Sequence, residues 1–200
     1  LTGITEGLAV DRASVWFLSA DHQLMQCSCL LDNGELSTPQ LALARQQFPR
    51  YFAELDKKRV INASQARTDP ATSEFTESYL LPQDIWSMLD VPLRYQGEVI
   101  GIICCEQTGA PRQWTDEDAG FVGALSDLYG RILAAAERLR YQQQLEQLKI
   151  EHRDLDDSIR ALSAQTLVDQ LQIARLKKKK LVLKDRIMRL EDQLIPDIIA

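Results

Sequence analysis

The chain has 200 residues, of which 45% are apolar, and a formal net charge of -6. This length allows one ordinary domain with an appendage or two small domains, and the apolar content suffices for a hydrophobic core. No run approaches the roughly 18 uninterrupted apolar residues of a membrane span, and the first residues lack the basic-then-apolar layout of a secretory signal, so we expect a cytoplasmic protein without a membrane partner.

Charge is distributed unevenly along the chain. Residues 1–140 hold 12 Lys and Arg against 19 Asp and Glu, whereas residues 141–200 hold 11 against 10. Phosphate binding relies on clustered Lys and Arg, so the acidic first part argues against a nucleic-acid partner.

The first elements predict a short helix end followed by strands. Residues 1–8 indicate the helix end, and the apolar runs 13–18 and 24–31 predict a first hairpin, followed by a turn at 32–34. The ambiguous segment 41–46 favours a short strand.

A helix over residues 49–57, with Pro at its first position, comes next. Its predicted buried face consists of Tyr51, Phe52 and Leu55. Residues 60–63 then indicate a short strand.

A polar loop at 64–70 is followed by a predicted helix over residues 72–81. Phe75 and Tyr79 lie on one face of this helix, so it presents aromatic surface toward whatever it covers.

The region 87–106 predicts a β-hairpin. Two apolar runs, SMLDVPLRY and EVIGIICCE, flank Gln96 and Gly97, and a Gly-containing two-residue connection is typical of adjacent antiparallel strands.

Thr115 begins the longest predicted helix, because its hydroxyl can cap a free N–H and three acidic residues follow it. Apolar residues then repeat at spacings of four and three, as in a coiled-coil seam: Phe121, Leu125, Leu128, Ile132, Ala135 and Leu139. A second repeat is out of phase by one residue: Tyr141, Leu145, Leu148, His152, Leu155, Ile159 and Leu162. The shift turns the stripe by about 100° and marks a boundary near 139–141.

Residues 163–170 interrupt the second repeat, and Thr166 with Asp169 resembles a capping box. A further helix carries the heptad positions Ile173, Leu176, Lys180, Leu183, Ile187, Leu190 and Leu194, and Pro196 is expected to stop it. The tail is therefore a predicted helical hairpin, and we place two domains at 1–138 and 139–200.

The element order and the pieces FPRYF, ARTDPAT and SMLDVPLRYQGEVIG resemble the GAF sensor modules of bacterial histidine kinases and diguanylate cyclases. The resemblance covers about residues 1–138 and implies an α+β fold. In such domains a central antiparallel sheet of five or six strands has the first and last helices on one face and a small-molecule pocket on the other. They commonly dimerise through those helices.

The tail resembles a different family. Its stretches EHRDLDDSIRAL and DQLQIARLKKKKLVLKDRIMRLEDQLIPDIIA are similar to the small bacterial YdcH-like family, a two-helix unit without a well-defined biochemical role. This unit stands where a kinase or cyclase output usually follows a GAF domain.

The pattern and the GAF resemblance together point to one ligand pocket. An apolar cavity with a few polar groups is the usual form of a small-ligand site. Arg67 is the best candidate to meet an anionic ligand, although it could instead pair with Asp69 or Glu74. The candidate residues are Phe48, Tyr51, Arg67, Thr68, Phe75, Tyr79, Ile85, Ser87, Met88, Asp90, Cys104 and Glu106, among which Phe75, Tyr79 and Met88 could equally be core residues.

No bound cofactor is expected. Phytochrome-type GAF domains attach a bilin through a Cys-His pair a few residues before the position of Tyr79, but Phe75 and Thr76 occupy those positions here. Haem is disfavoured because the two histidines, His22 and His152, lie in a predicted turn and in the helical repeat.

The cysteines and the lysine run leave alternatives open. Cys27, Cys29, Cys104 and Cys105 are interpreted as core thiols, since their spacing does not fit the usual knuckle of a four-thiolate metal site. The run 177–180 is interpreted as a solvated helix surface, with binding to RNA, DNA or an anionic membrane as the alternative.

No Gly-rich phosphate loop, nucleophile–base pair or carboxylate pair in a defined cleft is recognisable, so we do not expect an enzyme. The leading hypothesis is a cytoplasmic signalling module that binds a small molecule and forms a homodimer through the helix at 115–139. The alternatives are an oligomerising scaffold whose hairpin recruits a protein partner, and a redox sensor that uses the cysteines.

Overall fold

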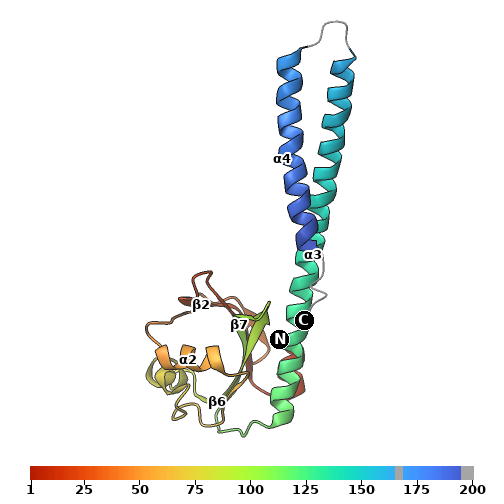
Figure 1. Ribbon diagram of the computed structural model, residues 1–200. Coiled ribbons are helices and arrows are strands. Elements are labelled where there is room, and N and C mark those ends of the chain that lie inside the picture. Colours follow the sequence, from red (N-terminus) through yellow and green to blue (C-terminus); the bar gives the residue numbers. More distant parts are fainter. Residues whose placement is uncertain (165–168, 195–200) are drawn as a thin grey trace. The chain divides into compact units, whose positions relative to one another are not determined.

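The computed structural model describes residues 1–164 and 169–194 (Figure 1). The chain forms two compact units, Leu1–Ile132 and Leu133–Ala200, and the long helix α3 (Asp116–Ser163) runs through the division. Among the helices in the described ranges, none combines the length and the apolar character needed to cross a membrane.

A seven-stranded antiparallel sheet forms the centre of the first unit. Its strands follow the order β3-β2-β1-β7-β6-β5, and β4 also pairs with β2. The predicted antiparallel sheet is thus confirmed, and it has one strand more than the upper bound of the expectation. The strands are β1 (Arg12–Leu18), β2 (Leu24–Asp32), β3 (Glu35–Ser37), β4 (Ala42–Ala44), β5 (Ile61–Ala63), β6 (Ile85–Tyr95) and β7 (Glu98–Thr108).

Helices cover both faces of this sheet. One face packs on α1 and the first turns of α3 through buried side chains that include Leu8, Leu89 and Val122. The other packs on α2, the 3-10 helix η1 and the π-helix η2 through a second cluster that includes Phe52 and Phe75. The bounds of these helices are α1 (Thr2–Leu8), α2 (Pro49–Lys57), η1 (Ser73–Phe75) and η2 (Thr76–Leu80).

Two tight turns set the register of the hairpins. Asn33 and Gly34 join β2 to β3, and Gln96 and Gly97 join β6 to β7, each pair with positive φ at both positions as type I′ turns require. The strand β3 was not predicted, because its residues are all exposed and show no apolar alternation.

The predicted helix over residues 72–81 takes a different form. It is divided into η1 and η2, and a backbone bond from Leu81 N to Thr76 O closes a wide turn. This widening places Phe75 and Leu80, five residues apart, both in the core.

The approach of β1 to β7 depends on a glycine. A Cβ at Gly101 would lie 2.1 Å from the backbone O of Trp16, so only glycine allows these two strands to pair at this point.

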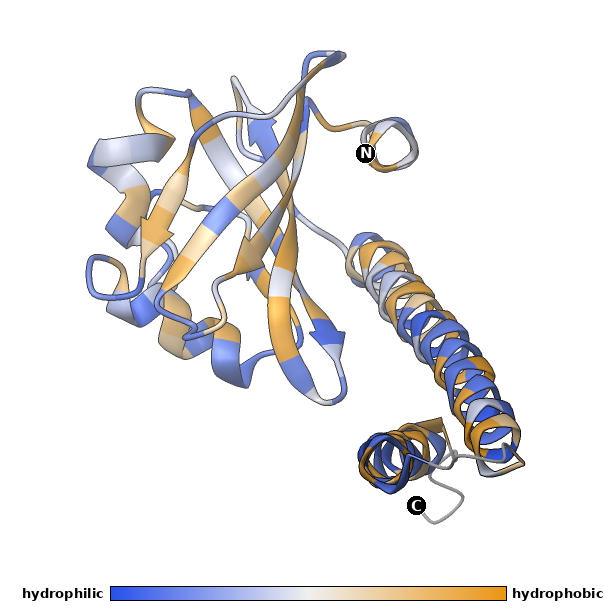
Figure 2. Ribbon diagram, turned by 90° about the horizontal axis from the view of Figure 1, so that it is seen from above, coloured by the Kyte–Doolittle hydropathy of each residue, from blue (hydrophilic) through white to orange (hydrophobic). Residues whose placement is uncertain are grey.

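The second unit is an antiparallel pair formed by α3 and α4 (Gln170–Leu194). The ion pairs Lys149–Glu191 and Lys179–Glu151 join the two helices. The buried side chains of this pair, Leu155, Ile173 and Leu183, belong to the second repeat and to the heptad positions on α4, and Figure 2 shows polar residues between the apolar ones.

The ends of the long helices have clear capping. At α3, Thr115 Oγ1 accepts from Asp118 N at 3.1 Å and the Asp118 carboxylate accepts from Thr115 N at 2.8 Å. At α4, Asp169 Oδ1 accepts from Gln172 N at 2.9 Å. The predicted contributions of Thr166 and Pro196 lie outside the described residues.

Candidate functional site

A partly enclosed cavity of about 200 Å³ lies between the sheet and the segments α2, η1 and η2. Its floor is formed by inward-facing residues of β1, β6 and β7, and its walls are mostly aromatic or aliphatic. The lining residues are Trp16, Leu41, Ala42, Leu43, Gln47, Phe48, Tyr51, Phe75, Ser78, Tyr79, Met88, Asp90, Ile102, Cys104 and Glu106.

Eight of the twelve predicted pocket residues line this cavity: Phe48, Tyr51, Phe75, Tyr79, Met88, Asp90, Cys104 and Glu106. The strand residues among them come in pairs two positions apart, which places both members of each pair on the same face of the sheet. The helical residues among them are the aromatic side chains that the sequence placed on the covering segments.

Three other predicted residues lie nearby but not in the lining. Ile85 is buried in the adjoining hydrophobic cluster. The Ser87 hydroxyl donates to the backbone O of Ser64 at 2.8 Å, and the Thr68 hydroxyl donates within its own turn to the backbone O of Gln65 at 3.4 Å. These hydroxyls brace the loop between β5 and η1.

Arg67 was expected to line the cavity, but it does not. Its Nε donates to Ile85 O at 2.8 Å, its terminal nitrogen pairs with Asp84 at 2.9 Å, and its guanidinium lies 3.8 Å from the centre of a Trp86 ring. Asp84 therefore takes the place of the ion-pair partners predicted from the sequence, and the guanidinium is held away from any ligand in the cavity.

Seven lining residues were missed: Trp16, Leu41, Ala42, Leu43, Gln47, Ser78 and Ile102. Ile102 lies two residues before Cys104 and four before Glu106, so strand alternation alone would have identified it. The residues of β1 and β4 reach the cavity only through strand pairing, which the sequence does not reveal.

Asp90 is a fully buried carboxyl group at the floor of the cavity. Its Oδ2 accepts from the Tyr51 hydroxyl at 2.6 Å, whereas its Oδ1 has no hydrogen-bond partner in the described parts of the chain. Burial raises the pKa of Asp90 to about 6, against the opposing effect of the Cys104 thiol and the Tyr51 hydroxyl. The carboxyl group is thus ionised at neutral pH at an energetic cost.

Glu106 is the second buried carboxylate of the floor. Its Oε2 accepts from Nε of Arg12 at 2.9 Å, and its Oε1, like the free oxygen of Asp90, finds no partner among residues 1–164 and 169–194. Burial acts to lower the pKa of Arg12, but the combined effects of Glu106 and Tyr79 outweigh it, so the pKa of the guanidinium is raised and Arg12 stays charged.

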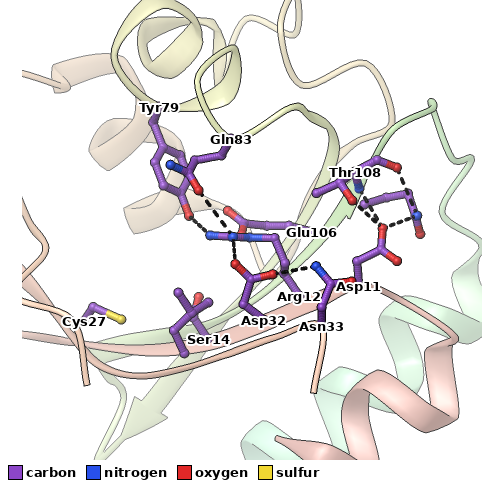
Figure 3. A network of polar contacts seen from close by, with 12 residues as sticks. Asp11, Arg12, Ser14, Cys27, Asp32, Asn33, Tyr79, Gln83, Glu106 and Thr108 are labelled. Atoms are coloured by element: carbon purple, nitrogen blue, oxygen red, sulfur yellow. Dashed lines mark hydrogen bonds and ion pairs between the residues drawn. The ribbon is translucent and has the colours of Figure 1, made fainter. Parts of the chain in front are cut away.

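Arg12 connects this floor to the covering segment (Figure 3). Besides Glu106, its guanidinium pairs with Asp32 and donates to Gln83 and to the Tyr79 hydroxyl, each at 3.4 Å. One side chain therefore contacts β2, β7 and the end of the segment that closes the cavity.

The cysteines near the cavity are held as thiols. Cys104 faces the cavity and Cys105 faces the opposite core, and burial raises the pKa of both. Within the described ranges, no group of three or more His, Cys, Asp and Glu side chains is arranged to hold a metal ion.

Comparisons with known families divide the chain in two. Residues 1–133 match the family model described as the GAF domain, and residues 145–191 match a family described as a protein of unknown function (DUF465), the YdcH-like region. Both resemblances read from the sequence are confirmed. No curated protein matches the chain.

Solved structures resemble part of the chain. The GAF domain of PixJ from Thermosynechococcus elongatus is 17% identical, with a TM-score of 0.57 over 70% of this chain and 86% of that chain. The GAF domain of an Acinetobacter phosphoenolpyruvate-protein phosphotransferase is 16% identical, with a TM-score of 0.52 over 69% and 79%. A fragment of a methyl-accepting chemotaxis protein is 14% identical, with a TM-score of 0.56 over 66% and 83%. At these identities the likeness establishes the fold.

The first prediction concerns the stability cost of Asp90. Because the folded chain raises this pKa from 3.8 to about 6, it binds a proton more tightly than the unfolded chain, so Asp90 makes stability fall as pH rises from about 4 to about 6. We expect Asp90→Asn to raise the free energy of unfolding by about 1–3 kcal/mol at neutral pH and by much less near pH 4. Urea unfolding at both pH values measures this.

The control for that measurement is Glu98→Gln, which changes an exposed carboxylate on the same hairpin. It should leave stability within about 0.5 kcal/mol at either pH. An Asp90→Asn chain less stable than the wild type at neutral pH would contradict the cost assigned to Asp90.

The second prediction concerns the ion pair between Arg12 and Glu106. Arg12→Met leaves Glu106 as an uncompensated buried charge, so we expect a loss of about 3–5 kcal/mol in the free energy of unfolding. Arg12→Met combined with Glu106→Leu should recover most of that loss, because replacing both partners by apolar residues is often close to neutral. A double-mutant cycle by urea unfolding measures the recovery; a double variant no more stable than Arg12→Met would argue against the pair.

Proposed function

Because the chain belongs to the GAF domain family, we propose that it is a non-enzymatic, cytoplasmic sensory module that binds a small organic ligand in the cavity and forms a homodimer through α3. GAF relatives are sensory and signalling modules. One observation supports ligand binding above the others: the cavity contains two buried carboxylates, each with one oxygen that lacks a partner among the described residues.

Unpaired buried oxygens need an explanation because they are costly. A buried acceptor without a hydrogen bond costs about 1–3 kcal/mol, and a charged one costs more. A perturbed carboxyl group inside a concave, largely apolar site is a frequent mark of a functional site. A bound ligand that donates to Asp90 and Glu106 accounts for their presence.

The ligand signal has a physical route through the cover of the cavity. Glu106 is bonded to Arg12, and Arg12 is bonded to Tyr79 and Gln83. A group that binds Glu106 competes with Arg12 for the carboxylate, so ligand occupancy shifts the hydrogen bonds that hold the covering segment.

Dimerisation through α3 is supported by an exposed apolar stripe. Leu128 is 51% exposed and Ile132 is 55% exposed, while Phe121 lies seven residues before Leu128 and Leu139 lies seven after Ile132. This spacing is that of a coiled-coil seam, and a second copy of the chain would cover it.

A scaffold role is the second candidate function. On α4, Leu181, Val182 and Met188 are each more than half exposed, outside the heptad positions that face α3. A protein partner that packs on this outer face would be recruited without any change in the cavity.

The third prediction tests ligand binding. Because a ligand that binds only the folded state stabilises it by mass action, at least one compound in a metabolite, nucleotide and tetrapyrrole screen should raise the melting temperature. Ser78→Trp places a large ring at the exposed rim of the cavity and should abolish that shift, whereas Ser158→Trp on the second unit should not. No thermal response to any compound removes the support for a sensor.

The fourth prediction tests the stripe on α3. We expect the full chain to sediment as a dimer, and Leu128→Glu to convert it to a monomer because a charge cannot be buried in the seam. Leu181→Glu, on the outer face of α4, is the matched control and should leave the dimer intact. Dissociation by Leu181→Glu and not by Leu128→Glu would instead favour the scaffold.

A further inference from the structure

The two unpartnered oxygens lie on neighbouring strands and on one face of the sheet. Asp90 on β6 pairs with Cys104 on β7, and Glu106 is two residues further along β7. Diagonal neighbours of this kind lie about 7–8 Å apart, close enough for one small ligand to reach both side chains. A carboxylate only accepts hydrogen bonds, so the group that satisfies it must be a donor.

The balance of charge at the floor favours a cation. None of the fifteen lining residues is Lys or Arg. Arg12 reaches the floor from β1, but its guanidinium is already shared between Glu106 and Asp32. The two groups that stabilise the Asp90 carboxylate, the Tyr51 hydroxyl and the Cys104 thiol, are both neutral, so a negative charge at the floor lacks a counter-charge and would repel an anionic ligand.

Aromatic side chains wall the same space. The rings of Phe48 and Tyr51 each lie 4.7 Å from that of Phe75, and Trp16 and Tyr79 complete the lining. Aromatic faces attract organic cations as well as apolar groups. The cavity therefore combines apolar, aromatic walls with a polar floor that accepts N–H groups.

The volume of the cavity limits the size of the ligand that it can hold. A cavity of about 150 Å³ lined by apolar side chains holds benzene, whereas sites for drug-sized ligands run to about 300–1,000 Å³. At about 200 Å³ the present cavity fits one ring with a short substituent.

We propose that the cavity binds an organic primary ammonium with a single-ring body, whose N–H groups are received by Asp90 Oδ1 and Glu106 Oε1. This inference rests on the proposed ligand-binding function and specifies the ligand class. A quaternary ammonium has the charge but no N–H donor, so it satisfies neither oxygen. A neutral alcohol of the same shape has one donor and no charge.

The test uses four probes that share one ring: benzylamine, benzyl alcohol, benzoate and benzyltrimethylammonium. The chain has three methionines, Met25, Met88 and Met188, of which Met88 lines the cavity and Met188 is exposed on α4. Titration of ¹³C-methyl-methionine protein reports binding at the cavity as a shift of the Met88 signal, assigned with Met88→Leu. The Met188 signal is an internal control.

We expect benzylamine to bind about 10- to 100-fold more tightly than benzyl alcohol or benzyltrimethylammonium, and benzoate not to bind, because hydrogen bonds to charged groups are the stronger ones. Asp90→Asn and Glu106→Gln should each weaken benzylamine binding by about tenfold or more and leave benzyl alcohol binding nearly unchanged. Glu98→Gln, on the same strand as Glu106 but exposed, should change neither.

Three results overturn the inference. If benzoate or benzyl alcohol binds at Met88 as tightly as benzylamine, the cavity is a ligand site of another class and the proposed function stands. If Asp90→Asn and Glu106→Gln both bind benzylamine like the wild type, the carboxylates are not its receptors. If none of the four probes shifts Met88, the inference fails, and the wider thermal screen decides on the proposed function separately.

Discussion

The buried ion pair between Arg12 and Glu106 is the interaction on which the cavity depends. Without Arg12, the floor would hold two carboxylates in a poorly solvated space with no cation beside them, and the charge of Glu106 raises the pKa of Asp90. The pairing of β1 with β7 places Arg12 directly opposite Glu106, so the register of the sheet supplies the counter-charge. Arg12 engages one oxygen of Glu106, and the other is buried without a partner among the described residues. The hydrogen bond from Arg12 therefore stabilises the buried charge of Glu106 but satisfies only one of its two oxygens.

The lengths of the hydrogen bonds around Arg12 indicate which of its contacts are the weakest. Its bond to Glu106 is 2.9 Å long, a normal charge-assisted contact, whereas its bonds to Tyr79 and Gln83 are 3.4 Å long, near the limit of a hydrogen bond. A small shift of the guanidinium toward Glu106 or away from it therefore loses little hydrogen-bond energy with Tyr79 and Gln83. That segment is already irregular, with a 3-10 turn followed by a π turn, a form that recurs at functional sites.

Local patterns in the sequence predicted several local elements, but not the exposed strand β3 or the irregular form of residues 72–81. The helix over residues 49–57 and its buried face follow from apolar spacing and from Pro49, and the β6–β7 hairpin follows from Gln96 and Gly97. Arg12 was missed because its partner Glu106 is 94 residues away, and no periodicity reports such a pairing. Arg67 was predicted to bind a ligand because the sequence does not show that it forms an ion pair with Asp84. Strand alternation predicted most of the residues at the floor of the cavity. The counter-charge of Arg12 depends on strand pairing between distant parts of the chain, which alternation does not report.

Under the proposed ligand-binding function, Asp90 also explains why a more stable sequence would serve less well. An amide at Asp90 would remove a buried charge and its cost, yet it would also remove an oxygen that only accepts hydrogen bonds. The core on the opposite face of the sheet, which includes Leu89, Val91 and Val122, supplies apolar burial that does not involve the cavity. Since folded domains keep only a small margin of stability, this second core and the apolar cluster on the cavity face together offset the cost of the unpaired acceptors.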